Sequence, residues 1–118
     1  MGLTFIDITI RPSPKSRQHR TLPVLVDTGA SQTVVPGKLL RELGIEPHET
    51  MEFELADGST IERKVGRAFI EIDGRGEYAP IVFGEKGDSD LLGVMTLELL
   101  RLFVDPLHRE LHPLKQRL

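Results

Sequence analysis

Apolar and polar residues alternate along much of this chain in segments of strand length. Residues 5–10 place an isoleucine at every second position between polar residues, which is typical of a half-buried strand. Residues 22–26 form a continuous apolar run, which predicts a buried strand, and residues 33–35 predict another short one. Eleven glycines and eight prolines divide the chain into short pieces, which favours strands over helices.

A hairpin is predicted in the middle of the chain. Residues 51–55 put alternate apolar side chains on one face, and a return strand begins at Thr60. Between them, the pair Asp57-Gly58 supplies the positive φ that a tight hairpin turn needs. Residues 68–72 of the return strand again alternate, so one face of this strand is expected to enter the core.

The remaining elements are shorter. A brief helix is predicted over residues 38–44, with Pro36 before it and Gly44 after its last turn. A second helix is predicted over residues 96–102, with Thr96 as its N-cap. The other expected elements are a strand over residues 78–83, an apolar segment over residues 91–94 and a hairpin over residues 103–111 that turns at Asp105-Pro106.

Composition narrows the function classes. The chain has 118 residues, which predicts a single domain over residues 1–118. Its net charge of −3 gives no indication of nucleic-acid binding, which calls for a cluster of basic residues. It contains no cysteine, which excludes disulfides, thiolate catalysis and zinc–thiolate sites. No signal-peptide pattern or membrane-length apolar run is present, so a cytoplasmic location without membrane contact is expected.

The candidate chemistry lies in the stretch LPVLVDTGASQTVVP, residues 22–36. It presents one carboxylate, Asp27, on a turn of small residues between two apolar strands. Asp and Gly are common in turns for reasons of their own, so the alternative interpretation of Asp-Thr-Gly is a plain turn without a catalytic role. The hairpin tip about 30 residues later, and the apolar Leu-Leu-Gly at residues 91–93 before a helix, favour an active site.

Together these features resemble the retropepsin-like (retroviral-type) aspartic proteases, the single-lobed members of clan AA. The resemblance covers roughly residues 4–112, and the residues TVVP after the turn also look like the family's usual continuation. It implies a mainly β fold, a closed acid-protease barrel with a β-hairpin flap and one or two short helices. It also implies that two chains form a homodimer, because one Asp-Thr-Gly provides only half of a carboxylate pair.

The resemblance assigns roles to the turn. Asp27 would be the catalytic carboxylate, and Thr28 would hydrogen-bond across the two-fold axis. Gly29 would let the backbone approach the substrate. Ala30 replaces a hydroxyl that pepsin-like relatives can use to stabilise the ionised carboxylate, so we expect a pH optimum nearer neutral than that of a gastric enzyme.

The resemblance also assigns the hairpin tip. Ala56, Asp57, Gly58 and Ser59 would form the flap that covers an extended peptide or an unfolded protein segment. The implied function is that of an aspartic endopeptidase, a hydrolase in which Asp27 and its symmetry mate activate a water molecule, with no cofactor. Leu-Leu-Gly at residues 91–93 would be scaffold behind the site.

Two departures keep an alternative open. Retroviral members commonly carry an Asp and an Arg where this chain has Ser31 and Val94, so the ion pair that supports their dimer is missing. The hairpin tip is also more polar than the retroviral one. The alternative is a peptide-binding or dimerisation module of the same fold with little proteolytic activity.

No metal site is expected from the sequence. His108 and His112 have the four-residue spacing of helical metal ligands, but Asp105-Pro106 and Pro113 make a helix there implausible. Residues 87–90 are acidic but lack the ligand spacing of a calcium loop.

Overall fold

The structure is a computed structural model that describes residues 3–115, 117 and 118. The elements follow one another as β1 (Phe5–Arg11), β2 (Arg20–Val26), β3 (Thr33–Pro36), α1 (Gly37–Glu42), β4 (Glu49–Glu54), β5 (Thr60–Ile72), β6 (Arg75–Gly84), β7 (Leu91–Leu92), α2 (Val94–Leu99), β8 (Leu102–Asp105) and β9 (Glu110–Pro113). The fold is mainly β with two short helices, as the sequence predicts. No helix among the described residues is long and apolar enough to cross a membrane.

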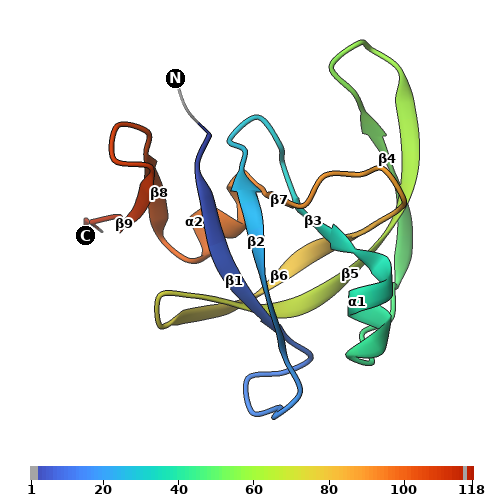
Figure 1. Ribbon diagram of the computed structural model, residues 1–118, viewed down its shortest axis with the longest axis horizontal. Coiled ribbons are helices and arrows are strands. Elements are labelled where there is room, and N and C mark those ends of the chain that lie inside the picture. Colours follow the sequence, from blue (N-terminus) through green and yellow to red (C-terminus); the bar gives the residue numbers. More distant parts are fainter. Residues whose placement is uncertain (1–2, 116) are drawn as a thin grey trace.

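Seven strands form one curved sheet in the order β1-β2-β7-β3-β6-β5-β4 (Figure 1). The sheet turns back on itself because residues 9–11 of β1 also pair with residues 69–71 of β5. The sheet is therefore not the fully closed barrel that is expected from the sequence. The pairing between β1 and β5 is short, and β4 lies beyond it as an edge strand. Strands β2 and β6 are also longer than predicted, since pairing with their neighbours extends them beyond their apolar cores.

The core lies inside the curved sheet. The alternating isoleucines of β1 and β5 point inward, and Ile8, Ile10 and Ile70 are fully buried. Leu92 of β7 and Leu40 of α1 close the same cluster. Each such side chain contributes about 1.5–3 kcal/mol through burial, so the apolar pattern of the sequence accounts for the position of the core.

Helix α1 agrees with the sequence prediction. It follows Pro36 directly, and Gly44 after its end has a φ of +78°, a conformation that glycine adopts without strain.

Helix α2 differs from the prediction. It begins at Val94 with Gly93 as N-cap, and Thr96, the expected N-cap, lies inside the helix and is buried. The Thr96 hydroxyl pairs with the buried hydroxyl of Thr33, with 2.6 Å between the oxygens. No local pattern in the sequence reveals this partner on β3, so Thr96 has the sequence features of an N-cap although its hydroxyl makes a hydrogen bond in the core.

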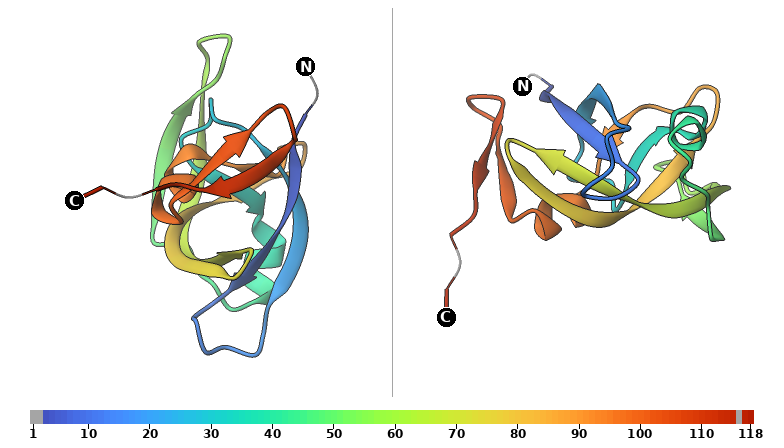
Figure 2. Two further views of the ribbon diagram at one scale, coloured as in Figure 1. Left: turned by 90° about the vertical axis from the view of Figure 1, so that its left-hand side faces the viewer. Right: turned by 90° about the horizontal axis from the view of Figure 1, so that it is seen from below.

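The last two strands form a separate hairpin. Strands β8 and β9 form a two-stranded sheet of their own within the part of the chain that the structure describes, and Asp105 lies directly opposite Glu110 next to the turn. This matches the predicted turn at Asp105-Pro106. Figure 2 places the hairpin at one end of the molecule, next to α2 and away from α1.

Candidate active site

Strand β2 carries Asp27 to the edge of the core. The strand runs parallel to β7, with Val26 opposite Leu92, and the Asp27 N–H donates to the Leu92 carbonyl at 3.0 Å. Strand β7 lies between β2 and β3, so both strands that flank the Asp27 turn pair with the same central segment. The apolar Leu91 and Leu92 therefore act as scaffold for the turn, in agreement with the sequence interpretation.

The carboxylate of Asp27 is oriented by its own loop. The Gly29 N–H donates to Asp27 Oδ1 at 2.9 Å, and the Ala30 N–H donates to the Asp27 carbonyl at 3.1 Å. In the described part of the chain, Oδ2 receives no hydrogen bond and so remains available to water or to another group. Asp27 is half-buried, whereas Thr28 and Gly29 are exposed.

The start of α2 packs directly against this loop. The Val94 and Met95 N–H groups donate to the carbonyls of Ala30 and Ser31 at 2.9 and 3.1 Å. A Cβ on Gly93 would lie 2.4 to 2.7 Å from backbone atoms of Gln32. Only glycine permits this approach, since real Cβ contacts are never so short.

A buried hydroxyl pair fixes the same junction. Thr33 Oγ1 accepts a hydrogen bond from the Gly93 N–H at 3.1 Å and also pairs with the Thr96 hydroxyl. Both threonines are almost fully buried. This network ties β3, β7 and α2 together behind the Asp27 loop.

A cleft of about 670 Å³ opens between the Asp27 loop and the β4–β5 hairpin. Gly29 and Ala30 of the predicted site line it on one side, and Met51, Phe53 and Leu55 line it on the hairpin side. Asp27 and Thr28 are not among the residues that line the cleft; Asp27 is linked to the lining by the hydrogen bond from the Gly29 N–H. The cleft is therefore bordered by the two residues that follow Asp27 and Thr28 in the loop.

The tip of the hairpin stands away from the cleft wall. Ala56, Asp57, Gly58 and Ser59 are all exposed, and none of them lines the cleft. The tip is held by its own bonds: the Leu55 N–H donates to the Ser59 carbonyl at 2.7 Å, and the Ser59 hydroxyl and N–H donate to Asp57 Oδ1 at 2.5 and 2.9 Å. These hydrogen bonds from Ser59 lower the pKa of Asp57.

The cleft wall also contains a charged pair that the sequence does not predict. Arg63 of β5 donates from Nε and Nη2 to the two carboxylate oxygens of Asp88 at 2.7 and 2.9 Å. Both residues line the cleft, and the hydrogen bond from Arg63 lowers the pKa of Asp88. Since they lie 25 residues apart and on different elements, no local pattern in the sequence could link them.

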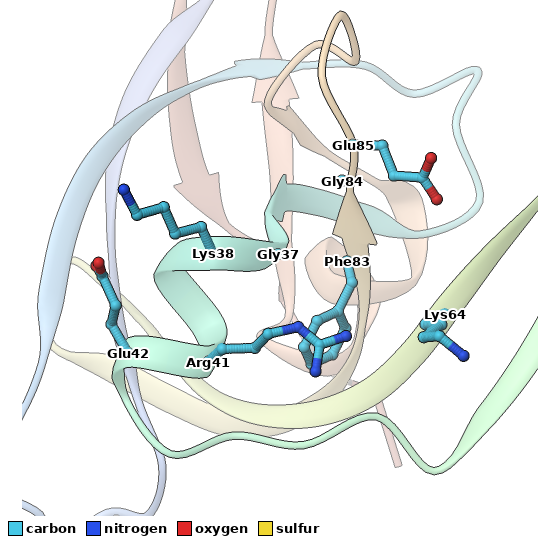
Figure 3. A pocket seen from close by; sticks show the side chains of 8 residues that line it. All are labelled: Gly37, Lys38, Arg41, Glu42, Lys64, Phe83, Gly84 and Glu85. Atoms are coloured by element: carbon cyan, nitrogen blue, oxygen red, sulfur yellow. The ribbon is translucent and has the colours of Figure 1, made fainter.

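A second hollow lies on the other face of the sheet (Figure 3). It has a volume of about 580 Å³ between α1 and the end of β6, and the Arg41 guanidinium lies 5.3 Å from the centre of the Phe83 ring. Phe83 and Lys64 line this hollow, whereas their chain neighbours Val82 and Arg63 line the cleft. Because successive strand residues point to opposite faces, this hollow is separated from Asp27 by the sheet.

The chain provides one oriented carboxylate in a loop whose next residues, Gly29 and Ala30, line the cleft. Ser31 and Val94, where the retroviral ion pair would lie, are indeed brought together, since both take part in the backbone contacts between the loop and α2. They carry no charge, so the junction is held by backbone hydrogen bonds and packing. Peptide hydrolysis by carboxylates needs two such groups, one ionised and one protonated.

Comparisons with known proteins agree with this geometry. The solved structure of EIAV protease complexed with the inhibitor HBY-793 matches with a TM-score of 0.58 at 18% identity, over 84% of this chain and 88% of that one. The simian foamy virus (mac) protease matches with a TM-score of 0.55 at 21% identity, over 84% of this chain and 94% of that one. At these identities the likeness concerns the fold, which is that of the retroviral proteases. No curated protein sequence matches this chain.

Residues 17–98, which include the Asp27 loop, the hairpin and most of α2, match the family described as gag-polyprotein putative aspartyl protease. This match covers more than half of the 118 residues. The chain belongs to that family of retroviral-type aspartic proteases.

Proposed function

We propose that this protein is a homodimeric aspartic endopeptidase in which Asp27 and its symmetry mate form the catalytic pair. The observation that carries the proposal is the Asp27 carboxylate: its loop borders the cleft through Gly29 and Ala30, and among the described residues Asp27 Oδ2 receives no hydrogen bond. A two-fold axis beside this loop would place Asp27 of a second, identical chain next to it, and this second Asp27 would supply the other carboxylate. Thr28, exposed next to Asp27, is suitably placed to hydrogen-bond across the axis.

The chemistry follows from the paired carboxylates. Two carboxylates about 3 Å apart cannot both ionise readily, so they share a proton; aspartic proteases are the established example of this behaviour. The ionised partner takes a proton from a water molecule, and the protonated partner donates to the carbonyl oxygen of the peptide. The water oxygen attacks the carbonyl carbon, and the C–N bond breaks as the amine takes up a proton. No covalent intermediate is needed.

The cleft supports an extended peptide as the substrate. Its wall is partly the strand β4, whose lining side chains Met51 and Phe53 offer apolar contacts to alternate residues of a bound strand. The β4–β5 hairpin would close over the peptide and exclude water, as flaps and lids do. The bidentate pair of Arg63 and Asp88 would give one end of the cleft a polar subsite.

The dimer contact would be mainly apolar, because the charged pair at positions 31 and 94 is absent. Large apolar side chains are exposed on β1, where Phe5 pairs with Leu25 near the end of β2, and on α2, the start of which contacts the Asp27 loop. Phe5 is 59% exposed and Leu99 is 39% exposed. A partner chain that covers such residues would remove apolar surface from water at about 25 cal/mol per Å².

The direct test is cleavage of a mixture of unfolded-protein peptides by the native chain and by Asp27→Asn, across about pH 4 to 7, where a shared-proton pair can be active. We expect cleavage by the native chain only, with the mass of a dimer for both proteins in sedimentation. Asp73→Asn, the same change at an exposed carboxylate in the turn between β5 and β6 and outside the cleft, is the matched control and should retain activity.

The alternative is a peptide-binding module of the same fold. A native dimer that binds the peptides in titration calorimetry but cleaves none of them would favour that function. Equal cleavage by the native chain and by Asp27→Asn would contradict the proposed carboxylate mechanism.

A further inference from the structure

The hairpin of β8 and β9 gathers four ionisable side chains at its turn, at the end of the molecule that Figure 2 shows beside α2. The ligand atoms of Asp105, Glu110 and His112 all lie within 4.8 Å of one another. His108, in the turn, places Nδ1 2.7 Å from Asp105 Oδ2. None of these residues belongs to the Asp27 loop or to the cleft.

The strand register explains why these side chains meet. Asp105 pairs directly with Glu110, and His112 pairs with Phe103 two positions further along. Since side chains at every second position share a face, Asp105, Glu110 and His112 all lie on the same face of the hairpin. The sequence could suggest only the helical spacing of His108 and His112, which this hairpin does not use.

Two carboxylates directly opposite each other in a strand pair repel and destabilise the pair. His112 Nε2 lies 3.2 Å from Asp105 Oδ2 and 3.2 Å from Glu110 Oε1. A single ring nitrogen carries at most one hydrogen and cannot donate well to both oxygens. A cation bound to all three ligand atoms would offset the negative charge of both carboxylates, whereas one hydrogen bond from His112 reaches only one of them.

The distances suit a divalent transition metal. Zinc binds imidazole nitrogen and carboxylate oxygen at about 2.1 Å, which places tetrahedral ligands roughly 3.4 Å apart. The two separations of 3.2 Å from His112 Nε2 are close to this value. One imidazole with two carboxylates is a ligand set for zinc and similar metals rather than for magnesium.

We propose that Asp105, Glu110 and His112 form a binding site for a divalent transition metal such as zinc, which staples β8 to β9. The His108 hydrogen bond orients Asp105, as second-layer groups orient metal ligands. The same hydrogen bond lowers the pKa of Asp105 to about 2. The other Asp105 oxygen accepts the Leu107 and His108 N–H groups at 3.0 and 3.2 Å.

A metal ion at this site would stabilise the hairpin of β8 and β9. An isolated two-stranded hairpin is only marginally stable in water. Among the described residues, strands β8 and β9 pair with no other strand, and Phe103 and Leu107 of this hairpin are exposed. A metal bound near the turn would order the hairpin without adding to its apolar core.

The test is titration of the untagged, chelator-treated chain with zinc chloride in a calorimeter. We expect one zinc ion per chain, and amide NMR shift changes confined to the hairpin. Binding should be lost in His112→Gln and in Glu110→Gln, and weakened about 10- to 100-fold in His108→Gln.

The matched control is His48→Gln. His48 Nδ1 also lies near a carboxylate, 3.5 Å from Glu49 Oε2, but no third ligand completes that pair. His48→Gln should bind zinc as the native chain does. Glu110 is exposed, so loss of folding would not explain its effect. Failure of the native chain to bind zinc, or equal binding by Glu110→Gln, would overturn the proposal, and neither readout depends on peptidase activity.

Discussion

The Asp27 loop borders the cleft, whereas the tip of the β4–β5 hairpin stands clear of its wall, and the two regions are held in opposite ways. The loop is fixed from outside itself: β7 and the start of α2 donate to or accept from its backbone, and Gly93 packs against Gln32 with no room for a side chain. The tip is exposed, and its hydrogen bonds run between Leu55 and Ser59 only. One region is therefore rigid by tertiary contact and the other is ordered only locally.

This difference matches what a carboxylate protease requires. The reacting group must be held to within a fraction of an ångström, which demands a supported loop. The cover of a peptide channel must open for substrate and product, which demands few tertiary contacts. Substitutions in the two regions should therefore affect different quantities.

The largest effect is expected for Gly93→Ala. The φ of Gly93 is −90°, so any residue could adopt its backbone conformation, but the new Cβ would collide with the Gln32 backbone. We expect a loss of about 3 kcal/mol or more in the free energy of unfolding, measured by urea denaturation. Gly58→Ala in the hairpin tip is the matched comparison: it has open space at a φ of +85° and should cost only about 1 kcal/mol. Equal losses would contradict the contrast between the regions.

Thr33→Val should have the next largest effect. It leaves the Gly93 N–H and the Thr96 hydroxyl without their buried partner, which costs about 1–3 kcal/mol. The control is Thr21→Val, because Thr21 and Thr9 form an exposed hydroxyl pair at 2.9 Å. Thermal unfolding should separate the two variants clearly. A Thr33→Val protein as stable as Thr21→Val would show that the network behind the loop is dispensable.

Ala30→Ser should change the pH dependence of cleavage rather than stability. A hydroxyl next to the carboxylate pair can donate to the ionised form and favour it, so the acid side of the rate profile should move to lower pH. Ser31→Ala, the neighbouring change, should leave the profile in place. The profile of kcat/KM against pH is the measurement, and an unchanged acid limb in Ala30→Ser would refute the role given to Ala30.

The smallest effect is expected in the flap tip, for Asp57→Asn. Since its hydrogen bonds from Ser59 lower the pKa of Asp57 below the usual 3.8, they stabilise the turn above about pH 3.8 and lose this effect as the pH falls through the lowered pKa. The Ser59 amide should therefore titrate below pH 3.8 in NMR spectra of the native chain. In Asp57→Asn this titration should vanish with little change in thermal stability, whereas Glu54→Gln should leave it intact.

Much of the fold could be predicted from local pattern. The alternating segments predict β1, β4 and β5, and Pro36 and Gly44 mark the two ends of α1. These signals are visible because strand alternation and helix ends depend on residues that are close in the sequence. The Asp-Thr-Gly turn could likewise be recognised, since its residues are consecutive.

Contacts between distant segments could not be predicted. Helix α2 begins at Val94, two residues before the predicted start at Thr96, because the buried partner of Thr96 lies on β3 and leaves no local signal. The Arg63–Asp88 pair and the hairpin cluster around Asp105 depend on which strands face each other. Side chains that meet through strand register leave no periodic signal in the sequence.

The most direct test of the central claim, that two chains complete one site, is a mixing experiment. Native chain and Asp27→Asn are mixed in varied ratios at constant total concentration, allowed to exchange subunits, and assayed for peptide cleavage. If each site needs Asp27 from both chains, activity falls with the square of the native fraction. A linear fall would mean that each chain cleaves by itself, which would contradict the account.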